Sequence, residues 1–231
     1  MDHRYIPSNT DRQIKELQAA RLQSWGRINK YRLRAILNYS GSSILDVGCS
    51  TGSYVRYLNN KGYKALGLDL LFDSDWKINK EKFYVVGAAL QIPFTSRAFD
   101  TVLSFELLEH VYQPEKALKE MYRVCRKNII LSVPDCELSP DMLKSGVILA
   151  HWRDQTHCNY FTIELIKNLL ERNGFQLELL TRINPIRPDY LVYKSFHIPD
   201  KLAILLSRLT RRILLRKQFF MTILAVANKV N

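Results

Sequence analysis

A glycine-rich turn after a short apolar segment constrains the fold of this chain more than any other feature. Residues 44–53 read ILDVGCSTGS, with Asp46 ahead of Gly48 and Gly52, and a helical pattern follows at 54–58. The order strand, tight turn, helix is that of a nucleotide-binding unit, in which glycines let a ligand approach the backbone. The G-x-G-x-x-G pattern of dinucleotide-binding loops is absent, so the ligand is expected to be of another kind.

Three further strand-like segments follow the glycine turn, at residues 63–69, 83–87 and 98–105. The first of them ends in Asp69, close to the position at which an acidic residue binds ribose hydroxyls in nucleotide-binding folds. Strands that alternate with helices predict an α/β protein with a mostly parallel sheet and a ligand at the carboxyl ends of its strands.

The order of four motifs resembles class I S-adenosylmethionine (SAM) methyltransferases of the type 11/23 group, including quinone-pathway O-methyltransferases. After D-x-G-x-x-x-G come Ile-Pro-Phe at 92–94, Phe-Asp-Thr-Val at 99–102 and Leu-Glu-His-Val at 108–111. The resemblance implies a Rossmann-like, doubly wound, mostly parallel seven-stranded sheet with helices on both faces. SAM is the implied cofactor.

The resemblance also implies which residues contact SAM. They are Asp46, Gly48, Cys49, Ser50, Gly52, Asp69, Leu70, Ala88, Ala89, Leu90 and Phe105. Two of them depart from the family pattern, because Ser50 replaces a glycine and Ala88 replaces the aspartate that usually accepts a hydrogen bond from adenine. One lost hydrogen bond costs about 1 kcal/mol, or about tenfold in affinity, so weaker SAM binding is expected rather than its loss.

Two polar segments are candidates for the chemistry of transfer. Glu106, Glu109 and His110 are spaced as on one face of a helix, and His157 lies in a later polar loop. The set resembles the divalent-metal ligands of small-RNA 2′-O-methyltransferases and quinone-pathway O-methyltransferases. Two carboxylates and two imidazoles favour Mn²⁺, Fe²⁺, Co²⁺ or Zn²⁺, which would lower the pKa of an acceptor hydroxyl.

A metal-free interpretation of the same residues stays open. His157 alone is then the catalytic base or an acceptor-binding residue, and Glu109 with His110 forms a hydrogen-bonded structural pair at the start of a helix. Aromatic residues near His157, namely Trp152, Tyr160 and Phe161, form either an acceptor wall or an anchor of the loop on the core.

Charge divides the chain into a neutral centre and two basic ends. The net charge is +12, and residues 1–40 and 181–231 carry eighteen Lys and Arg against five acidic residues. We expect residues 1–40 to form a helical lid and 41–231 the methyltransferase domain, with a basic helical insertion at about 185–217. The four cysteines lack a CxxC pair and the first residues lack an apolar signal core, which predicts a cytoplasmic protein.

Leucines and arginines of the insertion occupy different faces of a helix predicted over 200–217. The apolar face carries Leu202, Leu206, Leu209 and Ile213, and a second face carries Arg208, Arg211, Arg212 and Arg216. Such a helix can cap the active site, lie peripherally on a membrane surface or, less favoured by the absence of an RNA-binding module, contact nucleic acid.

Together these features predict a SAM-dependent methyltransferase that acts on a hydroxyl of a small-molecule, saccharide or lipid-linked acceptor. Two alternatives remain open from the sequence: a metal-dependent RNA 2′-O-methyltransferase, and a methyltransferase-like partner subunit without catalysis.

Overall fold

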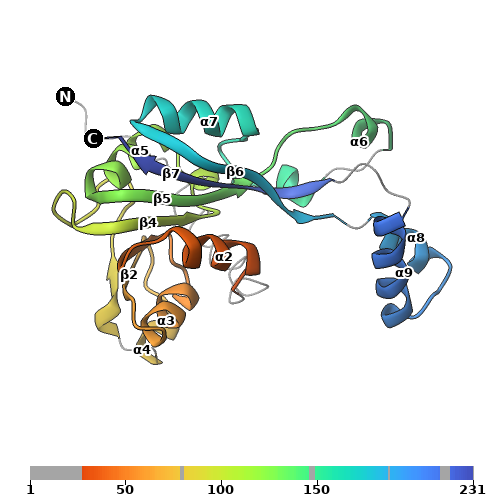
Figure 1. The fold of residues 1–231 in the computed structure, drawn as a ribbon, viewed down its shortest axis with the longest axis horizontal. Helices are drawn as coiled ribbons and strands as arrows, with labels where there is room; N and C mark the ends of the chain where they lie inside the picture. The colour runs from red at the N-terminus through yellow and green to blue at the C-terminus, as the bar shows by residue number, and fades with distance from the viewer. Residues whose placement is uncertain (1–27, 79–80, 146–148, 187, 214–218, 231) are drawn as a thin grey trace.

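A seven-stranded sheet forms the centre of the computed structural model, which describes residues 28–78, 81–145, 149–186, 188–213 and 219–230 (Figure 1). The strands are β1 (Ser43–Val47), β2 (Lys64–Asp69), β3 (Tyr84–Val86), β4 (Phe99–Phe105), β5 (Cys125–Pro134), β6 (Phe175–Pro185) and β7 (Phe220–Lys229). Their order is β3-β2-β1-β4-β5-β7-β6. The first five strands pair in parallel, and β7 runs antiparallel to both of its neighbours. The predicted mostly parallel seven-stranded sheet is confirmed.

Helices cover both faces of this sheet (Figure 1). The helices of the described chain are α2 (Lys30–Tyr39), α3 (Ser53–Asn60), α4 (Asp75–Ile78), α5 (Pro114–Val124), α6 (Pro140–Ser145), α7 (Ile163–Arg172), α8 (Pro188–Ser195) and α9 (Asp200–Ile213), with 3₁₀ turns η1 (Glu81–Phe83), η2 (Leu108–His110) and η3 (Ala150–Arg153). Successive side chains of a strand point to opposite faces. Ile44 of β1 accordingly packs in the core beneath α2 and α3, and Leu45 packs in the core beneath α5 and α7.

Local sequence signals explain where several helices begin and end. Thr162 caps α7 by accepting a hydrogen bond from the Leu165 amide, and Gly174 follows that helix with a φ of +83°. Pro114 begins α5, where its missing N–H costs nothing. Of the expected N-terminal lid, residues 30–39 form α2, and residues 1–27 lie outside the described part of the chain.

The expected helix through Glu106 and His110 is wrong. A single 3₁₀ turn covers residues 108–110, and Glu106 precedes it with a φ of +50°. The Glu106 amide donates to the Ser132 carbonyl on β5, so its backbone still follows the sheet. The helical spacing that would place Glu106 beside Glu109 and His110 is therefore absent.

The basic insertion forms two helices, α8 and α9, where one was expected at 200–217. They connect β6 to β7, and Figure 1 shows this pair set apart from the sheet, beyond the carboxyl ends of β5 and β6. Among the described residues, no helix combines the length and apolar character needed to cross a bilayer.

Candidate functional site

The glycine loop between β1 and α3 turns through three residues in left-handed conformation. Gly48, Ser50 and Gly52 have φ values of +80°, +47° and +74°. The amides of Gly48 and Cys49 both donate to the Leu68 carbonyl, at 2.7 and 3.1 Å, and hold the loop against β2. Serine at position 50 therefore keeps the turn that the family's usual glycine would make.

Two aromatic side chains lie beneath the loop and fix its position. Trp76 is buried, and its indole N–H donates to the Ser50 carbonyl at 2.8 Å. The Tyr84 ring stacks on Trp76 with centroids 5.0 Å apart, and its hydroxyl donates to the Gly52 carbonyl at 3.3 Å. The sequence interpretation missed this pair, since neither residue lies within a motif.

Contact with Tyr84 makes position 52 intolerant of a side chain. A Cβ added to Gly52 would lie 2.2 Å from a Tyr84 ring carbon, whereas one added to Gly62, at φ +89°, meets nothing within 4 Å. We expect Gly52→Ala to destabilise the fold by about 2–4 kcal/mol and Gly62→Ala by only about 1 kcal/mol, because only the first adds overpacking to backbone strain. Urea denaturation measures both values, and equal effects would contradict the assigned contact.

Two buried carboxylates lie at the carboxyl ends of β1 and β2. Asp69 accepts hydrogen bonds from the amides of Ser50 and Leu71, at 2.8 and 3.1 Å, and so joins β2 to the glycine loop. Asp46 is 2% exposed. Burial, and then the neighbouring Asp69, raises its pKa from 3.8 to about 7, with Arg32 acting in the opposite direction. The surroundings of Asp46 therefore favour its neutral form.

Arg32 of α2 reaches over this edge of the sheet and was not among the predicted residues. Its guanidinium forms an ion pair with Glu106 and lies 5.2 Å from the centroid of the Phe105 ring. The signal was present in the sequence, because Arg32 shares a helix face with Ala35 and Ile36, which are buried. An arginine on an apolar face indicates a charged partner inside the fold.

The residues expected near adenine lie in the loops after β2 and β3. The Gly87 amide donates to the Asp69 carbonyl at 2.9 Å, which holds the two loops together. Leu70 is exposed, and Ala88, Ala89 and Leu90 are half-buried. Their contact with adenine stays a prediction.

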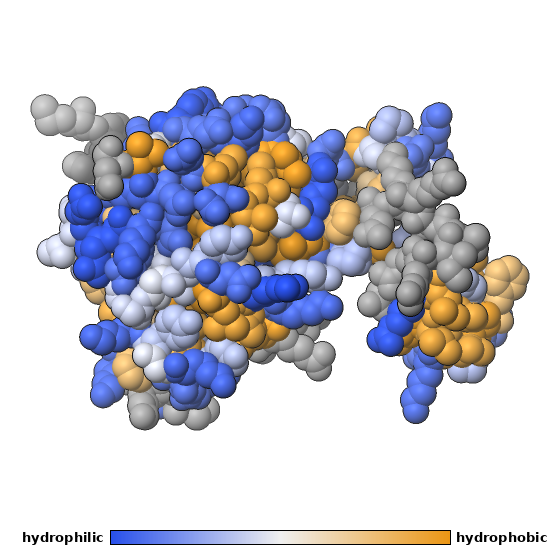
Figure 2. Space-filling view, viewed as in Figure 1, coloured by the Kyte–Doolittle hydropathy of each residue, from blue (hydrophilic) through white to orange (hydrophobic). Residues whose placement is uncertain are grey.

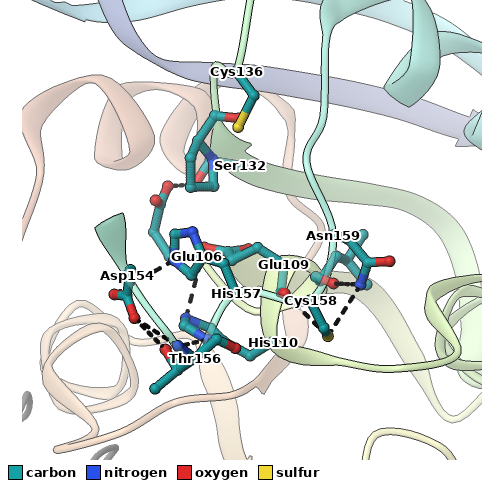
Figure 3. A network of polar contacts seen from close by, with 12 residues as sticks. Glu106, Glu109, His110, Ser132, Cys136, Asp154, Thr156, His157, Cys158 and Asn159 are labelled. Carbon is teal, nitrogen blue, oxygen red and sulfur yellow. Dashed lines mark hydrogen bonds and ion pairs between the residues drawn. The ribbon is translucent and has the colours of Figure 1, made fainter. Parts of the chain in front are cut away.

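Three ionisable side chains form a cluster in which Glu109 and His110 follow β4 and His157 comes from the loop after η3 (Figure 3). Ligand-capable atoms of Glu109, His110 and His157 lie within 4.8 Å of one another. Glu109 is 1% exposed, and within the described ranges neither of its carboxylate oxygens has a hydrogen-bond partner. Oε1 of Glu109 lies 3.9 Å from Nε2 of His110, which is too far for a hydrogen bond. The expected structural pair therefore leaves the Glu109 carboxylate without the hydrogen bonds that offset the cost of burial.

Glu106 lies outside this cluster. Its carboxylate accepts a hydrogen bond from the Ser132 hydroxyl at 3.0 Å and pairs with Arg32 (Figure 3). The structure thus brings together three of the four residues considered for a metal. A role of Glu106 as a ligand stays a prediction.

Thr156 and Asp154 orient the two histidines. Nδ1 of His110 is 3.2 Å from the Thr156 carbonyl and 3.0 Å from its hydroxyl, and that hydroxyl donates to Asp154. Because the carbonyl can only accept, Nδ1 of His110 carries the proton and Nε2 keeps its lone pair. Nε2 of His157 lies 3.6 Å from Asp154.

The other ring nitrogens, Nε2 of His110 and Nδ1 of His157, are buried and have no hydrogen-bond partner in the described part of the chain. Burial, followed by the charge of His110, lowers the pKa of His157 to about 4, and burial also lowers the pKa of His110. Both imidazoles are therefore neutral at pH 7. Burial and the nearby Glu106 raise the pKa of Glu109 well above its usual value.

The cluster and the glycine loop are neighbours in space. A Cβ placed on Gly48 would lie 3.0 Å from the side chain of Leu107, which precedes Glu109 by two residues.

The three aromatic residues expected near His157 have two different environments. Trp152 stacks on Tyr160 with ring centroids 4.9 Å apart, whereas Phe161 is buried in the core. Phe161 therefore anchors the loop, and an acceptor role for the stacked pair stays a prediction.

Comparisons with known proteins agree with the resemblance to methyltransferases found in the sequence. A family model described as a methyltransferase domain matches residues 17–180. An uncharacterized protein of Methanocaldococcus jannaschii is 36% identical over 183 residues, which cover 68% of this chain and 71% of that protein. A SAM-dependent methyltransferase from Archaeoglobus fulgidus, at 19% identity, shares the fold with a TM-score of 0.65, over 92% of this chain and 98% of its own.

Other curated relatives match over shorter stretches. The mitochondrial ubiquinone biosynthesis O-methyltransferase of Candida albicans is 36% identical over 97 residues, or 37% of this chain and 29% of its own length. Relatives named as N- and C-methyltransferases are also matched over less than two thirds of their length. The family model covers more than half of the chain. The chain therefore belongs to the class I SAM-dependent methyltransferases, and SAM is its cofactor.

Proposed function

We propose that this methyltransferase transfers its methyl group to a hydroxyl of a small-molecule, saccharide or lipid-linked acceptor. The observation that carries the proposal is the cluster of Glu109, His110 and His157 beside the glycine loop, whose inward-facing ligand atoms are buried and accept no hydrogen bond among the described residues. A neutral amine already presents a lone pair to the methyl group of SAM, whereas a hydroxyl must lose its proton during transfer. A site with spare proton-accepting and ligand atoms suits the hydroxyl.

The cluster also fits a divalent metal ion, which the resemblance to metal-dependent methyltransferases implies. Its three residues offer a carboxylate oxygen and two imidazole lone pairs, none of which is hydrogen-bonded among the described residues, and Nε2 of His110 lies 3.9 Å from Oε1 of Glu109. Glu109, His110 and His157 would hold the ion, and this donor set suits Mn²⁺, Fe²⁺, Co²⁺ or Zn²⁺. When bound, such an ion supplies Lewis-acid activation of an acceptor oxygen.

Other residues of the chain would bind SAM and orient the two histidines. Asp69 lies where the ribose hydroxyls of SAM would bind, and Asp46 places a carboxylate beside the cationic end of the cofactor. Asp154 and Thr156 hold the two imidazoles with their free nitrogens available, which keeps the acceptor side of the site ordered before substrate arrives.

Calorimetric titration with SAM, with and without Mn²⁺, tests the proposal first. We expect micromolar binding that Asp69→Asn weakens at least about tenfold, because a carboxylate that pairs with ribose hydroxyls is lost. Asp141→Asn, an exposed change on α6, is the matched control and is expected to bind as the unmodified chain does.

A screen with radiolabelled SAM then compares hydroxylated lipids, saccharides, small phenols and RNA oligonucleotides as acceptors. Transfer to a hydroxyl of the first three classes supports the proposal. Transfer confined to RNA would replace it with the 2′-O-methyltransferase alternative. Absence of SAM binding under both metal conditions would favour the partner-subunit alternative.

A further inference from the structure

The α8–α9 pair carries an apolar surface that the rest of the described chain leaves uncovered. Six of its large apolar side chains are between 45% and 72% exposed: Leu191, Val192, Phe196, Leu202, Leu205 and Leu209. Figure 2 shows hydrophobic side chains gathered over this pair of helices. Contiguous apolar surface of this kind marks an interaction site.

The exposed leucines of α9 form one stripe. Leu202, Leu205 and Leu209 recur at spacings of three and four residues, which places them on one side of the helix. A second side, carrying Ala203 and Ser207, is fully buried, and Thr210 is hydrogen-bonded to Tyr193 of α8. The contact between the two helices therefore uses a different side of α9 and leaves the leucine stripe facing outward.

Basic side chains flank the leucine stripe. Lys201 and Arg208 are exposed on α9 and lie one residue before Leu202 and Leu209. Residues 181–231 as a whole carry ten Lys and Arg against two acidic residues. An apolar stripe bordered by cations matches the boundary between acyl chains and anionic headgroups in a bilayer.

We propose that the α8–α9 pair docks the protein on anionic membrane surface. Because β6 runs parallel to β5, the pair emerges at the carboxyl ends of the parallel strands, where the glycine loop and the Glu109 cluster also lie. The docked protein would therefore present its site toward the membrane. This part of the inference rests on the proposed function and selects its lipid-linked acceptor class.

Vesicle sedimentation tests the docking without SAM. The full chain is expected to bind vesicles of equal parts phosphatidylcholine and phosphatidylglycerol, and to bind pure phosphatidylcholine at least about tenfold more weakly, because its basic side chains are attracted to anionic headgroups. Leu205→Glu with Leu209→Glu is expected to reduce binding at least about tenfold. Lys201→Gln with Arg208→Gln reduces it and weakens its salt dependence. Leu165→Glu, 50% exposed on α7, is the matched control and leaves binding unchanged.

Several results would overturn the proposal. The full chain does not bind vesicles, or the double glutamate variant binds them as well as the unmodified chain does. Light scattering that shows a dimer, which the double glutamate variant converts to monomers, would assign the surface to a second copy of the chain. RNA binding that needs the basic residues but not the leucines would equally assign the surface to nucleic acid. Circular dichroism and SAM titration of each variant show whether it is folded. Vesicle binding without SAM binding would refute the proposed function alone.

Discussion

Replacing Glu109 with Gln is expected to lower kcat for methyl transfer by about 10²–10⁴-fold while the Kd for SAM stays unchanged. Glu109 supplies the only carboxylate among the three clustered ligand atoms, and an amide in its place can neither take up a proton nor bind a cation as strongly as a carboxylate does. The side chain next to Gly48 of the glycine loop is that of Leu107 rather than Glu109, so SAM itself would keep its contacts with the loop. Steady-state kinetics with the acceptor found by screening, together with SAM calorimetry, measure the two quantities.

Thermal unfolding tests the role of Glu109 without measuring methyl transfer. Mn²⁺ is expected to raise the melting temperature of the unmodified chain, because an ion that binds only the folded state stabilises it. Glu109→Gln should remove that rise. Glu115→Gln, an exposed change on α5, should retain both the rise and full activity. A variant at position 109 that keeps kcat and the Mn²⁺ effect would refute the role of the cluster.

SAM affinity is expected to increase with pH up to about pH 7 and then to level off. Burial and Asp69 raise the pKa of Asp46 to about 7, so below that pH the carboxyl is protonated in the unliganded protein. The cationic end of SAM favours the ionised form, so binding releases a proton. Affinity should therefore fall about tenfold for each pH unit below 7. Calorimetry in buffers of different ionisation enthalpy measures the released proton directly.

Asp46→Asn should remove this pH dependence and weaken SAM binding at pH 8. The same change should stabilise the unliganded protein at pH 8 by at most about 4 kcal/mol, since the raised pKa makes ionised Asp46 unfavourable to folding above pH 4. Asp141→Asn should keep the pH dependence of the unmodified chain. Constant SAM affinity between pH 6 and pH 8 would contradict the assignment of Asp46.

The cofactor side of the site could be predicted from sequence because its information is local. Asp46, Gly48 and Gly52 lie within seven residues, and their backbone conformations follow from the turn itself. Asp69 ends the next strand, and adjacent parallel strands bring their ends together. The order of strands and helices places these residues, whereas the contacts that Trp76 and Tyr84 make with the loop from more distant positions were not predicted.

The acceptor side could be predicted only in part, because its geometry depends on contacts between distant segments. Glu106 and Glu109 have helical spacing in the sequence. In the structure, Glu106 has a left-handed backbone conformation, its amide is hydrogen-bonded to the Ser132 carbonyl, and its carboxylate pairs with Arg32 outside the cluster. The partners of Glu106 are 26 and 74 residues distant in sequence. The position of His157 near Glu109 could be predicted, because the resemblance to metal-dependent methyltransferases groups a distant histidine with the Glu-His segment.

The joint from which α8 and α9 emerge has a consequence for how the protein can change over time. Pro185 of β6 pairs with Phe220 of β7, and the Ile186 amide donates to the Phe219 carbonyl at 2.8 Å. The two strands are thus fastened together before the intervening segment begins. A segment bounded in this way can be lengthened, shortened or exchanged without altering the register of the sheet. Evolution can therefore change what the segment between β6 and β7 binds, while the residues of the methyl-transfer site keep their positions.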